Sequence, residues 1–461
     1  MALHKDNNFF RKTGKILLGV FLVMLLVPTL CSLLLAIPWV QNGVVDMAAR
    51  YASKKLQTTV SIGHIDVGFA GQIHIDDLYV EDYAADTLFY VGHIRAFIPR
   101  LGLTKEGLTF SHAHINRAKL YLREMPNGEM NIKQVVNRMV DPNAPRKGKF
   151  RLEMRDASIK DMDLVIERLE HRNPEYGIDY GNMRMSDLAA EVNRLTIDGQ
   201  VIFADIDAMT VREQSGFKVE DLSGKFYLTN GCIGFEEARL RTAESDIYIP
   251  SLAIVGNSWE EYKEYVERVE MELVVKEGRL TTDDLAYFAP RFRSWKTTFS
   301  EADLSLSGRV ADFTGEVYHI RAGNHTYARV GGSVRGLPEV KSTHFDLHID
   351  DFRTRSDEAL QLAHNIARLD FAPSVDELLL RLGSMQASGR FGGDFGHFTS
   401  QLGLATAVGR VNARASMRPA TQAKGQRRLE ASVATNCPIR VILNAVFLMI
   451  SATAVRSQSP L

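Results

Sequence analysis

The pattern of hydrophobic positions changes character twice along this chain. An uncharged apolar run extends from Ile16 to Pro38, and apolar residues recur at helical spacing between Gln41 and Leu56. From Thr58 onward, apolar and polar positions alternate in short runs that end at Gly, Asp, Asn or Pro. Such alternation is typical of antiparallel strands. The sequence therefore predicts an apolar segment, one amphipathic helix and then a mostly β chain.

The apolar run is long enough to cross a membrane. At ~1.5 Å per residue, a helix over 16–38 reaches about 34 Å, against about 30 Å of hydrocarbon. Basic residues flank it on the N-terminal side only: Lys5, Arg11, Lys12 and Lys15. This asymmetry predicts a cytoplasmic N-terminus, residues 1–15, and a chain that continues on the far side. A cleaved signal peptide is the alternative, but no small-x-small cleavage site is visible at the end of the run.

Helices are expected to be rare after the anchor. The amphipathic stretch 41–56 is interpreted as a helix that docks on the start of a sheet, with a lipid-facing gate helix as the alternative. Helical spacing recurs at 131–140, 258–269, 356–366 and 374–382. The polar, proline-bearing stretch 141–149 is interpreted as a boundary loop. Many short strands with few helices favour an elongated β architecture over a compact α/β enzyme.

Composition narrows the function classes. The chain has 461 residues and a formal net charge of -1, so no overall basic character indicates nucleic-acid binding. Its three cysteines, Cys31, Cys232 and Cys437, are too far apart for a disulfide framework or a CxxC metal site. Strand pairing and core packing must therefore hold the exported part together.

Candidate chemistry is sparse, and we predict no enzyme, no cofactor and no metal site. The chain contains no GxSxG, P-loop, HExxH or dinucleotide-binding motif. His112 and His114 share a strand face, but no third ligand accompanies them. The acid pairs Asp283-Asp284 and Asp350-Asp351 are interpreted as turn-capping groups. The glycine-rich stretch 389–396 indicates a bulge or tight hairpin rather than a phosphate cradle.

The apolar face of the long β part is the most informative feature for function. A strand with one apolar face must bury that face. A second layer would make a filled core, whereas an open trough would suit acyl chains, whose burial contributes ~0.8 kcal/mol per CH₂. The pattern alone leaves both interpretations open. The residues expected to face inward are Ile62, Val67, Ile73, Ile75, Leu120, Leu122, Leu304, Leu306, Phe345, Leu347 and Ile349.

Several segments resemble one known family. The anchor, the short helix, VSIGHIDVGFAGQIHIDDLYVED and HINRAKLYLREMPNGEMNI resemble the opening of AsmA-like and TamB-like proteins. SWEEYKEYVERVEMEL, LTTDDLAYFAP and GGSVRGLPEVKSTHFDLHID resemble the middle of TamB-like proteins of the Bacteroidetes type. The resemblance covers about Thr13 to Asn436 and contains no catalytic motif.

The resemblance implies a β-taco, which is a curled antiparallel sheet with an apolar interior. It implies an inner-membrane anchor, a periplasmic bulk and phospholipid transport toward the outer membrane. The alternative function is assembly of outer-membrane proteins with a TamA-like barrel partner. The expected parts are an AsmA-like region over 39–146, a TamB-like region over 147–430 and an atypical tail over 431–461. That tail is interpreted as a frameshift or truncation product, with a short membrane-associated segment as the alternative.

Overall fold

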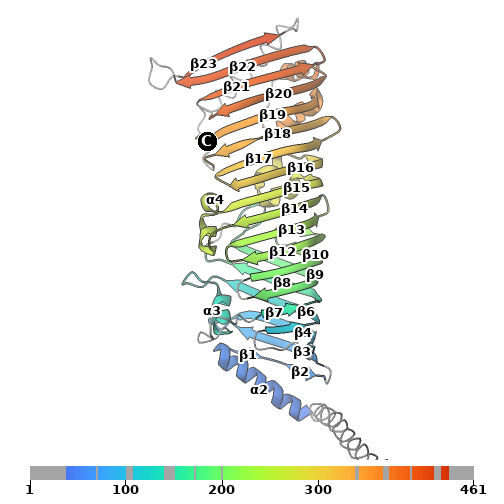
Figure 1. Ribbon diagram of the computed structural model, residues 1–461, viewed down its shortest axis with the longest axis vertical. Helices are drawn as coiled ribbons and strands as arrows, with labels where there is room; N and C mark the ends of the chain where they lie inside the picture. The colour runs from blue at the N-terminus through green and yellow to red at the C-terminus, as the bar shows by residue number, and fades with distance from the viewer. Residues whose placement is uncertain are drawn as a thin grey trace, which may run out of the picture. The chain divides into compact units, whose positions relative to one another are not determined.

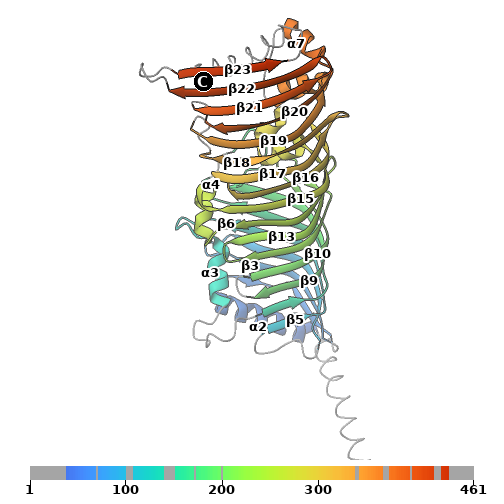
Figure 2. The ribbon, with the colours of Figure 1, turned by 45° about the horizontal axis from the view of Figure 1, so that its top comes forward.

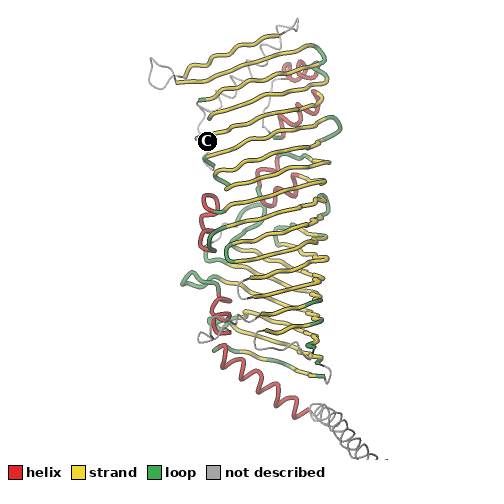
Figure 3. The backbone as a smooth tube through the Cα atoms, viewed as in Figure 1, coloured by secondary structure: helices red, strands yellow, loops and turns green. Residues whose placement is uncertain are grey.

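The computed structural model describes residues 38–68, 71–99, 107–139, 151–170, 173–198, 201–337, 342–366, 373–394, 397–419 and 427–435. Strands account for 63% of the structure and helices are few, so the predicted mostly β class is confirmed (Figure 3). The chain divides into two compact units, each described separately here. The N-terminal unit comprises Met1–Pro174 and Ile178–Gly216, and the C-terminal unit comprises Glu175–Gly177 and Phe217–Leu461.

The N-terminal unit is a mixed sheet. Its pairings run from β1 and β2 through β3, β4, β6, β8 and β9 to β10, and β5 and β7 also join this sheet through β9. Two pairs, β5–β7 and β6–β8, are parallel. The elements are α2 (Pro38–Leu56), β1 (Val60–Ser61), β2 (His64–Val67), β3 (Gln72–Glu81), β4 (Thr87–Phe97), β5 (Gly107–Phe110), β6 (His112–Arg123), α3 (Asn131–Met139), β7 (Arg151–Met154), β8 (Ala157–Glu167), β9 (Asn182–Asp198) and β10 (Val201–Glu213).

The C-terminal unit is simpler, because from β12 to β23 each strand pairs antiparallel with the next one along the chain (Figure 1). Its strands are β11 (Lys218–Val219), β12 (Asp221–Thr229), β13 (Cys232–Arg241), β14 (Asp246–Val255), β15 (Glu270–Thr281), β16 (Thr298–Arg309), β17 (Asp312–Ala322), β18 (Thr326–Arg335), β19 (His344–Arg355), β20 (Ser384–Gly393), β21 (Phe398–Thr406), β22 (Gly409–Pro419) and β23 (Arg427–Thr435). Its helices are η1 (Trp259–Glu264), α4 (Tyr265–Arg268), α5 (Thr282–Phe288), η2 (Pro290–Ser294), α6 (Ser356–Asn365) and α7 (Pro373–Leu380).

Most of the predicted helices are present in the structure. Helices α2, α3, α6 and α7 lie where helical spacing predicted them, and η1 with α4 covers the stretch 258–269. The sequence pattern predicts a turn at Asp283-Asp284, whereas the structure has helix α5 there. Thr281 caps that helix by accepting a hydrogen bond from the Asp284 amide, and the Asp284 carboxylate accepts hydrogen bonds from Thr242 and Ser245. Thr281 followed three residues later by an acid is an N-cap signal that could have revealed the helix.

The structure differs from the predicted sheet in strand direction and curl, and the predicted anchor lies almost entirely outside the described residues. The prediction of a purely antiparallel sheet was wrong in the N-terminal unit, because chain crossovers make β5–β7 and β6–β8 parallel. The sheet is mixed and uncurled, so the structure does not show the predicted curl. The predicted anchor lies outside the described residues apart from Pro38, as do loop 141–149 and residues 436–461 of the tail. No helix within the described ranges combines the length and apolarity needed to span a membrane.

A line of bulges crosses the strands of each unit. In the N-terminal unit, non-glycine residues with positive φ occur at neighbouring positions on β3, β6, β8 and β9: Asp77, Arg117, Asp161 and Asp187. In the C-terminal unit, the register shifts at corresponding points in every pair from β12–β13 to β19–β20 except β13–β14. The pairs from β20 to β23 carry no shift. A bulge bends its strand and keeps the apolar residues on one face on both sides of the bend.

Candidate functional site

The C-terminal unit carries continuous apolar rows on one sheet face. Pairing places Phe235 opposite Leu252, which lies opposite Leu273, which lies opposite Leu306. The same row continues through Gly315 and Gly332 to Leu347 and Phe391. Two flanking rows from β16 onward are also apolar: Leu304, Val317, Val330, Ile349, Gly389 and Leu402 on one side, and Gly308, Phe313, Val334, Phe345, Gly393 and Phe398 on the other.

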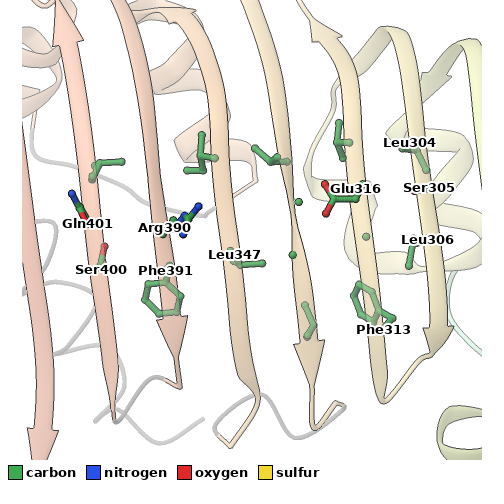
Figure 4. A pocket seen from close by; sticks show the side chains of 18 residues that line it. Leu304, Ser305, Leu306, Phe313, Glu316, Leu347, Arg390, Phe391, Ser400 and Gln401 are labelled. Carbon is green, nitrogen blue, oxygen red and sulfur yellow. The ribbon is translucent and has the colours of Figure 1, made fainter.

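Burial on this face changes along the unit. Across β12–β16 the face packs into a core around Ala238, Ile247, Ile249 and Val275. A second, smaller core around Leu382 and Val411 includes Leu379. Leu379 belongs to helix α7, which Figure 2 labels. Between these cores, an apolar hollow of about 520 Å³ extends over β16–β21 (Figure 4). This volume lies within the roughly 300–1,000 Å³ typical of small-molecule sites.

Two glycines, Gly315 and Gly332, lie in the middle of the hollow, and only one of them is required by its backbone conformation. Gly332 has a φ of +148°, and a Cβ there would collide with the Asp346 carbonyl oxygen, so its backbone requires glycine. Gly315 has no positive φ, and a Cβ there would lie 3.7 Å from Ser305 O and 3.8 Å from Leu306 Cγ, which is ordinary contact. The fold therefore does not require a glycine at 315. The missing side chain at that position leaves space between Leu306 and Leu347.

The predicted inward residues of the later sheet are brought together. Leu304, Leu306, Leu347 and Ile349 line the hollow. Leu347 is 37% exposed, so no second layer covers it. Phe345 lies on the same face, in the row beside Val334, but does not line the hollow. Sequence analysis missed the remaining wall, which consists of Phe313, Gly315, Val317, Val330, Gly332, Val334, Phe391 and Leu402.

The predicted residues of the first sheet lie in the N-terminal unit. Val67 pairs with Ile73, and Ile75 occupies the neighbouring row through Ile94 and Ile115. Leu120 pairs with Leu164, and Leu122 pairs with Ile166. Because the bulges keep the face constant, these five predicted residues share one face. Ile62 lies between β1 and β2, outside any strand.

The opposite face of the C-terminal unit is polar and largely charge-paired. His348 Nε2 lies 3.5 Å from Glu316 Oε2, and Arg353 lies 2.7 Å from Asp351. The pKa of Glu301 is lowered because its carboxylate forms a hydrogen bond with His319 and lies beside Arg321. Ser305, Glu316 and Arg390 alternate with the apolar positions, so their side chains point to this face and only their backbone borders the hollow.

The histidine pair, the acid pair at 350–351 and the glycine-rich stretch were the other motifs considered in the sequence. His112 Nδ1 lies 2.9 Å from Asp156 Oδ2, and no group of three metal-ligating side chains occurs among the described residues. Asp350 and Asp351 lie within β19 and pair with Arg329 and Arg353. Residues 389–393 form the end of β20, and just beyond it the Asp394 amide donates a hydrogen bond to the His397 carbonyl oxygen at 2.9 Å. Asp350 and Asp351 therefore pair with arginines inside a strand, and the predicted turn-capping role of this acid pair was wrong.

No protein-family model matches the chain, and comparisons with curated proteins and with solved structures return no match. The resemblance to AsmA-like and TamB-like proteins therefore stays a prediction.

Proposed function

We propose that this protein carries phospholipid acyl chains along the apolar face of its sheet. The supporting observation is the hollow over β16–β21, which has apolar walls and is open at Leu347. A row of leucine, valine and phenylalanine side chains offers acyl chains contacts worth ~0.8 kcal/mol per buried CH₂. In this proposal, lipid rather than a second protein layer covers the face.

The curled β-taco form belongs to the same proposal. The described sheet is uncurled, but a line of bulges marks corresponding points at which successive strands bend, and aligned bends allow a sheet to turn its apolar face inward. With an inner-membrane anchor and a periplasmic bulk, such a trough would conduct lipid toward the outer membrane and serve outer-membrane homeostasis. A lipid-conducting trough requires no catalytic residue and no cofactor.

Co-purifying lipid is the direct test of the proposal. We expect the full-length chain, extracted in mild detergent, to retain phospholipid that mass spectrometry detects after the detergent is exchanged. The expected lipids carry two long acyl chains. A chain that is free of lipid under these conditions, while remaining folded by circular dichroism, would count against the proposal.

Leu347→Asp separates an open groove from a filled core. Because Leu347 is 37% exposed, water can reach a carboxylate there, and we expect the melting temperature to change little while lipid binding falls. Val275→Asp is the matched control. Val275 is only 3% exposed, so an unpaired carboxylate there should cost several kcal/mol and unfold the unit. If both variants collapse in a thermal melt, the hollow is a core and not a groove.

Assembly of outer-membrane proteins is the second candidate. Among the described residues, β23 pairs only with β22, so its other edge could accept a strand from a TamA-like barrel or its client. Site-specific crosslinking from β23 discriminates the two functions. Capture of a barrel protein, with barrel levels falling before lipid balance changes on depletion, would favour assembly over transport.

A further inference from the structure

The last strands of the C-terminal unit carry a second hollow on the face opposite the groove. It measures about 790 Å³ and extends over β19–β23. Most of its lining residues occupy the positions that alternate with the apolar rows: Asp346, Arg390, Gly392, Thr399, Gln401, Arg414, Ser416, Glu430 and Ser432. Alternation places these side chains on the polar face. The two hollows therefore lie on opposite faces of the same strands, and Arg390, Phe391, Ser400 and Gln401 border both.

The register places two arginines on either side of an amide. Arg390 lies opposite Gln401, and Gln401 lies opposite Arg414. With strands ~4.8 Å apart, the two arginines are separated by about 10 Å at the backbone, so their long side chains can meet over Gln401. The neighbouring row places Thr399 opposite Ser416. These residues offer guanidinium, amide and hydroxyl donors to a single ligand.

Space above these donors is kept by a glycine. Gly392 lies opposite Thr399, and a Cβ at 392 would have the Thr399 hydroxyl, at 3.9 Å, as its nearest neighbour. This position therefore has room for a side chain that the sequence does not supply.

The arginines of this hollow differ from those of the preceding strands. Several exposed arginines there pair with acids, such as Arg309 with Glu270 at 3.2 Å and Arg239 with Asp246 at 2.8 Å. Arg390 and Arg414 are also exposed, yet they have no carboxylate partner within the described part of the chain. Between 384 and 435 the only acids are Asp394 and Glu430, against seven basic residues: Arg390, Arg410, Arg414, Arg418, Lys424, Arg427 and Arg428.

We propose that this hollow binds a phosphate ester that carries hydroxyl or amino substituents. The planar guanidinium forks of Arg390 and Arg414 match phosphate oxygens, and Gln401 with the hydroxyls donates to those that remain. Asp346 borders the hollow on the β19 side, where its exposed carboxylate can accept hydrogen bonds from a hydroxyl or an amine. Lipid head groups and soluble glycerophosphate esters share this chemistry.

Titration of the full-length chain in detergent tests the site. The soluble probe is glycerophosphoethanolamine, measured by calorimetry, and the lipid probe is a vesicle of phosphatidylethanolamine and phosphatidylglycerol, measured by co-sedimentation. Each lost charge-assisted hydrogen bond weakens binding about tenfold, so the double variant R390Q/R414Q should lose at least that factor. R309Q is the matched control, because Arg309 is exposed and paired with Glu270, and its binding should be unchanged. Asp346→Asn should weaken the ester but not inorganic phosphate.

The two arms identify the source of the ligand. Binding of the soluble ester that is lost in R390Q/R414Q supports a site for free esters. Binding of the vesicle alone, with the same loss, supports a head-group site. Absence of both, or an equal loss in R309Q, overturns the proposal. Circular dichroism of each variant verifies the fold, and the surface position of these arginines predicts an unchanged melting temperature.

Discussion

Leucine in place of Gly315 is expected to weaken lipid binding in the apolar hollow over β16–β21 while leaving the sheet intact. Position 315 lies between Leu306 and Gly332 in the central apolar row, and a Cβ there makes only ordinary contacts. The new side chain would occupy the space that we propose for an acyl chain. Exclusion of about three methylenes at ~0.8 kcal/mol each should weaken binding roughly fiftyfold.

The thermal stability of the Gly315→Leu variant should not fall, although its lipid binding does. Glycine within a strand is destabilising by roughly 0.5–1 kcal/mol relative to other residues, so Gly315→Leu should melt no lower than the native chain. The measurement is fluorescence titration with a fatty-acyl probe, combined with a thermal melt. Thr314→Leu, one residue away on the polar face, is the control and should bind normally. Unchanged binding in a folded Gly315→Leu variant would exclude this hollow as the acyl site.

Glu358→Gln is expected to produce the largest loss of stability among surface substitutions in the C-terminal unit. Glu358, on α6, accepts hydrogen bonds from the Thr326 hydroxyl at 2.6 Å and from the Asn324 and His325 amides at 2.9 and 3.1 Å. It therefore fastens the β17–β18 turn to α6. Charge-assisted hydrogen bonds contribute roughly 1.5–3 kcal/mol, so we expect a loss of about 2 kcal/mol at pH 7.

The pH dependence of this loss is a sharper test. Burial raises the pKa of Glu358, but the hydrogen bonds from Thr326, Asn324 and His325 outweigh it, so the pKa lies below its ordinary value. Its stabilisation is complete above the ordinary value of 4.5 and is lost as pH falls through the lowered one. The difference between variant and native chain should therefore vanish in acid. A difference that is constant with pH would contradict this account.

A matched control exists on the next helix. Glu377 on α7 pairs with Arg381, four residues later in the chain, and both side chains are 70% exposed. Such pairs contribute about 0.3–0.5 kcal/mol, so Glu377→Gln should have little effect in the same chemical-denaturation series.

The bulges leave a visible mark in the sequence, because the alternation of apolar and polar positions changes phase where an extra residue is inserted. Apolar positions run Ile73, Ile75 and then Leu78, Val80, so the alternation changes phase at Asp77, where the structure has a φ of 53°. That phase change marks an extra residue. A phase change of this kind in the alternation therefore predicts a bend as well as a strand.

Local patterns in the sequence are enough to predict the β class, most of the helices and the apolar character of the face that carries the hollow over β16–β21. These follow from local periodicity, since alternation fixes which residues share a face whatever lies opposite. Only the tertiary structure decided which strands are neighbours, that β5–β7 and β6–β8 are parallel, and that Gly315 and Gly332 meet between Leu306 and Leu347. Likewise, Arg390 and Arg414 are 24 positions apart in the sequence and meet only through Gln401 on the strand between them. Register between strands depends on long-range pairing, which a periodic pattern leaves open because every shift by two residues preserves the same face.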